Sequence, residues 1–267
     1  MKSLPIGRTA ALQAEYWNGV LKDWSDDQSA RLWRQHSDEV NRELVACWLP
    51  QAPNRRTLKT DLFDEAVGEG VFPLPGADSM IGIDLSSTAV GRAIVRHSGV
   101  CGIVADVRQL PFKSGSFDFV VSISTLDHLS GASEIKDALA ELNRVLRTGG
   151  VLVITMDNTH NPVVALRAMV QAPLLRLGAL PYFTGASCDA RGLRRLLAET
   201  GFDVQNETTV LHSPRLLAVT VARLLDTIRI PGLGRFYLRL LLKFERLASS
   251  RAANVTGHFV AARAVKH

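Results

Sequence analysis

The sequence has little cysteine and no metal-binding or disulfide spacing. Its 267 residues include three cysteines, Cys47, Cys101 and Cys188, and no two of them form a CxxC pair. An odd number of scattered cysteines argues against a disulfide framework and favours a reducing, cytoplasmic location. No HxxxH pair, Cys/His cluster or Ser-His-Asp signature is present, so nothing in the sequence indicates metal or nucleophilic chemistry.

Long apolar runs are also absent. The start, MKSLPIGRTAALQAEYW, has no extended apolar core, so no signal peptide is expected. No uninterrupted apolar run reaches about 18 residues, so the sequence predicts no membrane-spanning helix. There is no internal repeat and no low-complexity linker. The net charge of +5 and the isoelectric point of 9.4 permit an acidic partner without requiring one.

Strand-like and helix-like segments alternate between residues 102 and 158. Apolar runs rich in Val and Ile predict strands, and residues 135–146 carry apolar side chains at helical spacing before Gly149-Gly150. The three strand-like runs are residues 102–105, 117–123 and 151–154. Strands that are apolar on both faces and alternate with helices predict a parallel, doubly wound α/β sheet. Ligands bind beyond the carboxyl ends of such strands, where Asp106, Ser122 to Ser124 and Asp157 fall.

This stretch resembles the class I S-adenosylmethionine (SAM)-dependent methyltransferases. The matching pieces are AD at 105–106 with LPF at 110–112, FDFV at 117–120, LDHL at 126–129, and residues 142–153. The resemblance covers residues 56–155 and extends weakly to a last strand that includes residues 257–260. It implies a Rossmann-like methyltransferase sheet, mostly parallel with an antiparallel last strand, with SAM as cofactor. The expected division is a helical cap over 1–53 and a methyltransferase-like domain over 54–267, with a helical insertion at 211–255.

The family's glycine-rich turn after the first strand is altered in this chain. Residues 56–62 should form that strand, and Asp61 stands where the family has an acidic residue. FDEAV follows in place of the glycines, and Gly68 and Gly70 arrive too late. Because this turn departs from the family's pattern, Glu65 or Glu69 is expected to take the methionyl ammonium of SAM instead, although both acids also suit a solvated helix start. Lys59 lies inside a buried strand and is expected to pair with a carboxylate.

The acids after the second and third strands suit a nucleoside. Asp84 ends MIGID at residues 80–84, where an acid commonly binds ribose hydroxyls, and Leu85 follows it. The alternative for Asp84 is a helix N-cap. By resemblance, Asp106 accepts the adenine amino group and Val107 offers its backbone amide to a ring nitrogen. The alternative for Asp106 is a residue that only forms the turn after the third strand.

The end of the fourth strand should lie beside the methyl group. Ser122 and Ser124 end that strand, and Asp127 and His128 follow as the candidate catalytic residues. His128 suits a general base because its unperturbed pKa is near neutrality, and it equally suits a structural residue that anchors a loop. A SAM-dependent reaction needs no metal, because the sulfonium already activates the methyl group and the protein supplies alignment and proton removal.

Residues 1–50 are expected to be helical, at 10–21 and 29–49, with Pro50 and Pro53 ending the second helix. All four tryptophans lie here, at positions 17, 24, 33 and 48. They either pack this segment onto the sheet or line a substrate pocket under a helical lid. His36, Asp38 and Asn41 interrupt the apolar pattern of the second helix and are expected at the surface.

The second half of the chain is expected to supply a cap over residues 161–182, a helix at 190–200, and an antiparallel edge pair of strands at 202–210 and 257–265. The insertion at 211–255 has eight Lys or Arg and two acids. Residues 234–248 have the pattern of a basic amphipathic helix, with Arg235, Arg239, Lys243 and Arg246 on one stripe. This helix can cover the acceptor pocket, join a homodimer or contact a membrane surface.

These features favour a SAM-dependent methyltransferase that acts on oxygen of a small-molecule or lipid-like acceptor. The altered turn keeps two alternatives open: a lyase, cyclase or isomerase on the same fold, or a non-catalytic partner subunit that has lost the cofactor. Nucleic acid is not the expected substrate, because no Asn/Asp-Pro-Pro-Tyr motif follows the fourth strand and no RNA-binding appendage is recognisable.

Overall fold

The structure, a computed structural model, describes residues 9–26, 31–50, 55–72, 80–176, 183–228, 230 and 232–267. The strands are β1 (Thr57–Lys59), β2 (Met80–Asp84), β3 (Val100–Val104), β4 (Phe117–Ile123), β5 (Leu146–Asp157), β6 (Phe202–Val210) and β7 (Phe259–Lys266). The expected domain boundary at 53/54, with Pro53, lies outside the described residues.

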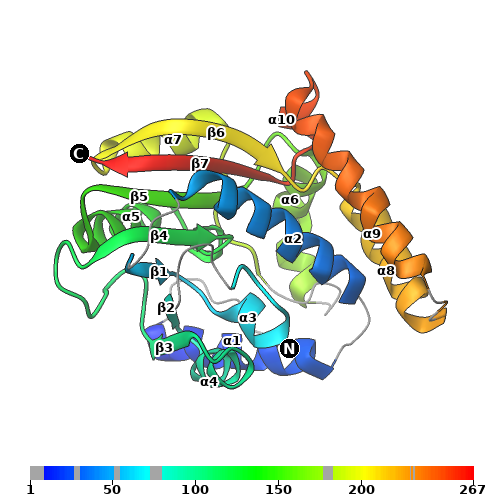
Figure 1. Cartoon of the computed structure of the whole chain (residues 1–267), viewed down its shortest axis with the longest axis horizontal. Coiled ribbons are helices and arrows are strands. Elements are labelled where there is room, and N and C mark those ends of the chain that lie inside the picture. Colours follow the sequence, from blue (N-terminus) through cyan, green and yellow to red (C-terminus); the bar gives the residue numbers. More distant parts are fainter. Residues whose placement is uncertain are drawn as a thin grey trace.

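The strands form one seven-stranded sheet in the order β3-β2-β1-β4-β5-β7-β6. Neighbours from β3 to β5 are parallel, and β7 runs antiparallel to both β5 and β6 (Figure 1). This confirms the predicted Rossmann-like methyltransferase sheet with its antiparallel last strand. The strand order across the sheet reverses between β1 and β4, so the carboxyl ends of these central strands border a shared crevice.

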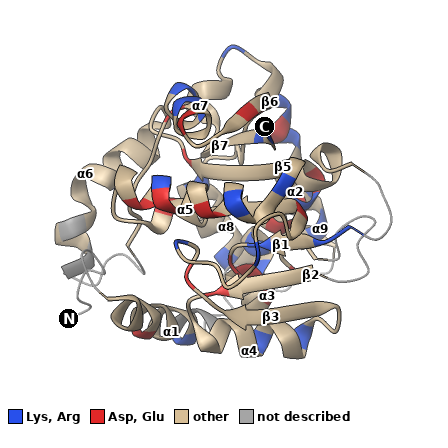
Figure 2. Cartoon of the chain, turned by 90° about the vertical axis from the view of Figure 1, so that its left-hand side faces the viewer, with Lys and Arg blue, Asp and Glu red and all other residues tan. Residues whose placement is uncertain are grey.

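Helices cover both faces of the sheet. They are α1 (Ala10–Asp26), α2 (Arg31–Trp48), α3 (Phe63–Val67), α4 (Ser87–Arg96), α5 (Ala132–Val145), α6 (Pro162–Arg176), α7 (Ala190–Glu199), α8 (Arg215–Ile228), α9 (Leu233–Lys243) and α10 (Ala253–Thr256), with 3₁₀ turns η1 (Leu126–His128) and η2 (Phe244–Ser249). Figure 2 shows α5 and α2 on opposite sides of the sheet.

The two faces of the sheet have separate apolar cores. Leu139 of α5 and Leu197 of α7 pack with Val120 on one face, whereas Val45 of α2 packs with Val121 on the other. All seven residues of β4 are buried, because a central parallel strand is covered on both sides. The helix predicted at 135–146 is α5, which ends at Val145, before the two glycines.

The insertion forms a helical hairpin of α8 and α9 that packs on α2. The helix predicted at 234–248 is α9 followed by the 3₁₀ turn η2, so its basic stripe lies on two consecutive elements. The predicted cap at 161–182 is α6 up to Arg176, and residues 177–182 lie outside the described part. Within the described ranges, no helix is long and apolar enough to cross a bilayer.

Candidate active site

A cavity of about 210 Å³ lies beyond the carboxyl ends of β1 to β4, bounded also by α1 and α2. Seven of the predicted site residues line it: Asp61, Asp84, Leu85, Asp106, Val107, Ser124 and His128. The other three, Glu65, Ser122 and Asp127, are described but lie behind its wall. The fold therefore brings most of the predicted residues to one place, while their individual roles stay predictions.

Asp84, at the end of β2, is held by backbone amides. Its Oδ2 accepts from the Leu62 amide at 3.0 Å and its Oδ1 accepts from the Ser86 amide at 2.7 Å. Burial nevertheless raises the pKa of Asp84 to about 6, because the two amides offset only part of the lost hydration. The N-cap of α4 is Ser86, whose hydroxyl accepts from Ala89, so Asp84 is not that cap.

Asp106 follows β3 and is paired with Arg108. The guanidinium Nη2 lies 2.6 Å from Asp106 Oδ2, and Nε donates to both carboxylate oxygens. Burial alone would raise the pKa of Asp106, but the hydrogen bonds from Arg108 outweigh it and the pKa is lowered. Arg108 also donates to Glu134 on α5 and to Gln13 on α1, so this pair ties α1 to the wall of the cavity.

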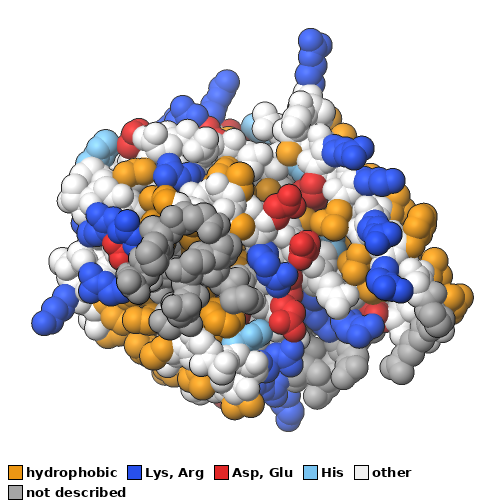
Figure 3. Space-filling model, in the orientation of Figure 1, with side chains coloured by type: hydrophobic (Ala, Val, Ile, Leu, Met, Phe, Trp, Pro, Cys, Tyr) orange, Lys and Arg blue, Asp and Glu red, His pale blue; other side chains and the backbone are white. Residues whose placement is uncertain are grey.

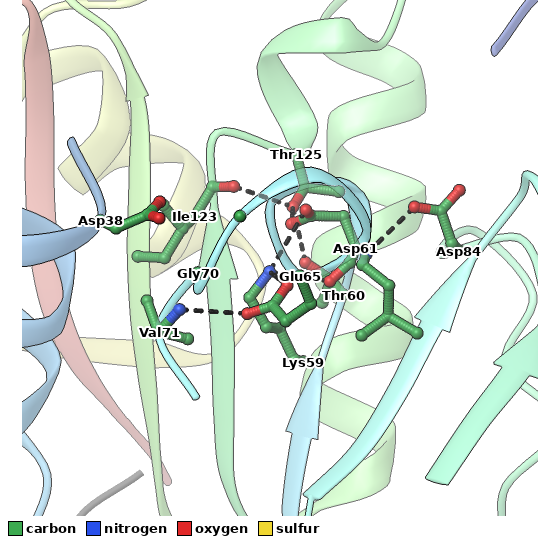
Figure 4. A network of polar contacts seen from close by, with 12 residues as sticks. Asp38, Lys59, Thr60, Asp61, Glu65, Gly70, Val71, Asp84, Ile123 and Thr125 are labelled. Atoms are coloured by element: carbon green, nitrogen blue, oxygen red, sulfur yellow. Dashed lines mark hydrogen bonds and ion pairs between the residues drawn. The ribbon is translucent and has the colours of Figure 1, made fainter. Parts of the chain in front are cut away.

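The turn after β1 contains a short helix, α3, instead of glycines, and a buried ion pair holds it. Lys59 Nζ lies 2.9 Å from Glu65 Oε2 and 3.2 Å from Asp61 Oδ1, which confirms the expected pairing of Lys59 (Figure 4). Glu65 also accepts from the Val71 amide at 3.1 Å. Glu65 is fully buried in this network, so the expectation that it meets a methionyl ammonium is not supported by its position.

Asp61 bridges this network and the cavity. Its Oδ2 accepts from the Thr125 hydroxyl at 2.7 Å, across the sheet at the end of β4. Glu69, the other candidate acid of the turn, is exposed, and its backbone amide donates to Asp38 Oδ2 at 3.2 Å. The glycine cradle of the resembled family is therefore replaced by side chains that fix one another.

Ser124, at the end of β4, has a left-handed backbone with φ of 48°, which is uncommon for a non-glycine residue. Its amide donates to Thr155 Oγ1 at 2.9 Å and its hydroxyl donates to Asp127 Oδ2 at 2.8 Å. Such strain persists where surrounding contacts over-determine the backbone, and it gathers at functional sites. Asp127 is buried, which raises its pKa to about 6, and it acts on the cavity through Ser124.

Ser122 and His128 have different surroundings. Ser122 is fully buried and accepts from the Thr60 hydroxyl at 3.0 Å, so it joins β4 to β1. His128 lines the cavity, with its ring centroid 4.7 Å from that of Trp17 in an edge-on contact. Burial lowers the pKa of His128, although Asp157 and Asp61 oppose the shift, so the imidazole is neutral at neutral pH.

Several cavity residues were missed by the sequence analysis. His36, Asp38 and Asn41 were expected at the surface, but all three are buried, and Asp38 and Asn41 line the cavity. The expectation was wrong because α2 packs between the sheet and the α8–α9 hairpin, which leaves its polar stripe no solvent. Asp38 and Asn41 are three residues apart, the spacing of one helix face, and this was the available signal.

The tryptophans were expected either to pack residues 1–50 onto the sheet or to line a substrate pocket. Trp17 and Trp33 line the cavity, whereas Trp48, the last residue of α2, packs against the core. The side chain of Trp24 lies outside the described part. Arg215, the first residue of α8, also lines the cavity and lies over the ring of Trp33, 5.7 Å from its centroid. The insertion thus contributes directly to the site.

The cavity wall is rich in carboxyl groups. They lie on α2, on α3 and at the ends of β1, β2 and β3: Asp38, Asp61, Asp64, Asp84 and Asp106. Burial raises the pKa of Asp38 to about 6 and, with Asp38 itself nearby, raises that of Asp64. Carboxylates gathered in a place of low polarity repel one another, so a ligand that carries positive charge would stabilise their ionised forms.

Comparison with known proteins identifies part of the chain directly. A family model for the methyltransferase domain matches residues 64–154, from α3 to β5. A demethylmenaquinone methyltransferase of Renibacterium salmoninarum is 32% identical over 162 residues, which cover 60% of this chain and 64% of that protein. Across the first curated relatives the matched share is 47% to 64% of their length, so the chain spans less than two thirds of each.

Solved structures share the fold over more of the chain. The cyclase SpnF is 17% identical, covers 99% of both chains and has a TM-score of 0.61. A geranyl diphosphate methyltransferase in complex with SAM is 15% identical, covers 85% of this chain and 84% of its own, and has a TM-score of 0.52. At such identities the likeness shows the fold alone. The family model and the curated relatives identify a methyltransferase domain within the chain, and SAM is the cofactor that these comparisons support.

Proposed function

We propose that this protein transfers the methyl group of SAM to an oxygen of a small, largely apolar acceptor. The observation that carries the proposal is the cavity itself. Its lining includes the carboxyl groups of Asp84 and Asp106 together with Trp17, His128 and Arg215. Charged and aromatic side chains in one enclosed space suit a polar cofactor and an apolar acceptor that must meet there.

The residues present fit SAM. Asp84 and Asp106 follow adjacent strands, and each carboxylate has acceptor capacity for hydroxyl or amino donors of a nucleoside beyond the bonds it already makes. The group of carboxyls in the wall suits the positive charges of the sulfonium and the ammonium. In this account Asp84 holds the ribose, Asp106 and Val107 hold the adenine, and Asp61 lies toward the methionyl end. Bound SAM supplies an activated methyl group.

The same cavity has apolar side chains and one neutral base for the acceptor. Trp17, Trp33, Leu211 and Phe259 line it, so an acceptor with an apolar body gains from leaving water. Demethylmenaquinone and geranyl diphosphate name the substrates of two similar proteins, which supports an acceptor of this kind. His128, neutral at neutral pH, takes the proton of the acceptor hydroxyl as that oxygen bonds to the methyl carbon and the carbon–sulfur bond breaks.

The test is release of S-adenosylhomocysteine with phenols and long-chain alcohols as probes, run beside demethylmenaquinone and geranyl diphosphate, which carry no alcohol or phenol hydroxyl. With an accepted probe, His128→Ala should reduce turnover about 10²–10⁴-fold and leave SAM affinity nearly unchanged. His160→Ala is the matched control, because His160 is an exposed histidine away from the cavity. Equal turnover in the two variants would remove His128 from the reaction. Loss of the folded state in His128→Ala alone would assign it to loop anchoring.

A second candidate is a non-methylating reaction on the same fold. It is favoured by the replaced glycine turn at α3 and by the fold shared with the cyclase SpnF over 99% of both chains. The same assay separates the two functions. A probe that is converted without release of S-adenosylhomocysteine would support the cyclase, lyase or isomerase class and contradict methyl transfer.

A further inference from the structure

The α8–α9 hairpin has an inner face that is fully engaged by the protein. Ala222 and Leu241 pack with Leu32 and Trp33 of α2. The Tyr237 hydroxyl donates to the Ala218 carbonyl at 2.8 Å, and Asp226 Oδ2 accepts from the Leu32 amide at 3.2 Å. The hairpin is therefore a fixed part of the fold, and its opposite face is a constant part of the protein surface.

That opposite face carries large apolar side chains in solvent. On α8, Leu217 and Leu224 are 64% and 57% exposed and lie seven residues apart on one stripe. On α9, Phe236 and Leu240 are 65% and 42% exposed and lie one helical turn apart. Ordinary protein surfaces expose single, scattered apolar residues. Here several large apolar side chains are exposed on two adjacent helices, and exposed patches of this kind mark interaction sites.

Cations accompany this apolar surface. Arg235, Arg239, Lys243 and Arg246 are all exposed on α9 and η2. Figure 3 shows Lys and Arg side chains in a column over α9, with hydrophobic side chains along the adjoining edge of the molecule. We call the exposed residues of α8, α9 and η2 the outer face of the hairpin.

The acids of the insertion are turned away from this column. Glu245 accepts from the amides of Leu211 and His212 at 3.0 and 3.1 Å, and Asp226 accepts from Leu32 and pairs with Arg31. Residues 211–255 contain no other acid. The outer face therefore combines apolar side chains with positive charge that no acid of the insertion balances.

We propose that the outer face docks on an anionic lipid surface and holds the protein there peripherally. Leu217, Leu224 and Phe236 would enter the boundary between headgroups and acyl chains, while the cations of α9 and η2 meet lipid phosphates. This arrangement removes the exposed apolar area from water and supplies the missing negative charge. It also suits the absence, within the described residues, of a helix able to cross the bilayer.

A second copy of the chain is a poorer occupant. In a two-fold symmetric dimer the same patch meets itself, so the cation column would face an identical column. Like charges brought together in an interface destabilise it, and no exposed acid of the insertion is available to separate them. A lipid surface has the complementary charge along its whole extent. The proposal does not depend on methyl transfer, because it rests on the outer face alone.

The test is co-sedimentation of the full chain with vesicles. The expected result is binding to vesicles that contain phosphatidylglycerol at low salt, weak binding to pure phosphatidylcholine vesicles, and release at high salt because screening weakens the attraction. No binding to the anionic vesicles at low salt by the folded protein would overturn the proposal without any variant.

Variants then locate the surface. Arg235→Glu with Arg239→Glu and Lys243→Glu should lower vesicle partitioning by about tenfold or more. Lys113→Glu with Arg191→Glu and Arg195→Glu makes the same charge change at exposed sites outside the hairpin, and it should leave partitioning far less affected. Equal losses in both triple variants would show that net charge, and not the outer face, governs binding, and would overturn the proposal.

The apolar part is tested separately. Leu224→Ser with Phe236→Ser should also lower partitioning about tenfold, with an unchanged melting temperature because both side chains are exposed. Unchanged partitioning in this variant would contradict insertion into lipid. Sedimentation velocity without vesicles measures the oligomeric state of the native protein and of the serine variant. A dimer that dissociates in the serine variant would assign the outer face to self-association and overturn the lipid proposal.

Discussion

Lys59 and Glu65 form an ion pair of 2.9 Å in which neither side chain is exposed to solvent. Lys59 ends β1 and Glu65 lies on α3, so the pair fastens the turn that follows the first strand. Burial opposes the charge on Lys59, but the carboxylates of Asp61, Glu65 and Asp64 outweigh it and raise the Lys59 pKa above its usual value. This chain thus holds the turn by charge and hydrogen bonds, at the place where the resemblance implied glycines.

Removing one partner of this pair should be strongly destabilising. Lys59→Met leaves Glu65 as an uncompensated buried charge, at a cost of about 3–5 kcal/mol in the free energy of unfolding. Urea denaturation measures the loss. The double variant Lys59→Met with Glu65→Gln should recover much of it, because the fully buried residue 65 is then uncharged and its amide oxygen still accepts from Val71. Glu69→Gln, on an exposed side chain, should change the free energy by less than about 0.5 kcal/mol. Strictly additive single and double variants would contradict the pairing.

Gly70 is the glycine that this turn requires. Its φ is +57°, and a Cβ there would lie 2.2 Å from Glu65 Oε1. Gly70→Ala should therefore destabilise the protein by more than about 1 kcal/mol, through strain and displacement of Glu65. Gly91→Ala is the matched control. Gly91 lies in α4 with nothing near the added methyl, so the change should stabilise by roughly 0.5–1 kcal/mol. Equal melting temperatures in the two variants would show that the turn is not constrained as described.

The carboxyl of Asp127 should make stability depend on pH. Burial raises its pKa to about 6 in the folded protein, above the unfolded value of 3.8. The folded state therefore binds the proton more tightly, and the stability this contributes is present below about pH 4 and lost as pH rises through about 6. Asp127→Asn removes this titration and keeps an oxygen that can accept from Ser124.

Comparing the two proteins isolates Asp127, because the other buried acids titrate in both. Relative to the native protein, Asp127→Asn should gain stability as pH rises from about 4 to 7, by up to about 3 kcal/mol, as follows from a shift of this size. Chemical denaturation across that range measures the difference. A difference that does not change with pH would mean that Asp127 keeps an ordinary pKa.

The parallel core of the fold was the part best predicted from sequence. Met80–Asp84 and Phe117–Ile123 match their predicted bounds, because the apolar runs there stop at polar residues. The edge strand Phe202–Val210 also matches its predicted bounds. The prediction that the acids at strand ends lie together followed from these strands, since the carboxyl ends of neighbouring parallel strands meet at one edge of the sheet. Asp84 and Asp106 consequently line the cavity.

Contacts between distant segments could not be predicted. The first strand was expected over 56–62 but spans Thr57–Lys59, because the chain turns into α3 around the Lys59–Glu65 pair. His36 is buried by the insertion, and its Nε2 lies 3.3 Å from Ser213 Oγ, 177 residues away along the chain. Helical periodicity shows which residues share a face, but it does not show what packs on that face.

The central claim is that the cavity between Asp84 and His128 binds SAM. Isothermal titration calorimetry of the purified chain with SAM and S-adenosylhomocysteine tests it most directly. The account predicts binding of both, weakened in Asp84→Asn by about 1–3 kcal/mol, the usual loss for a charge-assisted hydrogen bond. Glu69→Gln, away from the cavity, should bind like the native protein. No binding of either nucleoside at millimolar concentration by the folded protein would contradict the claim.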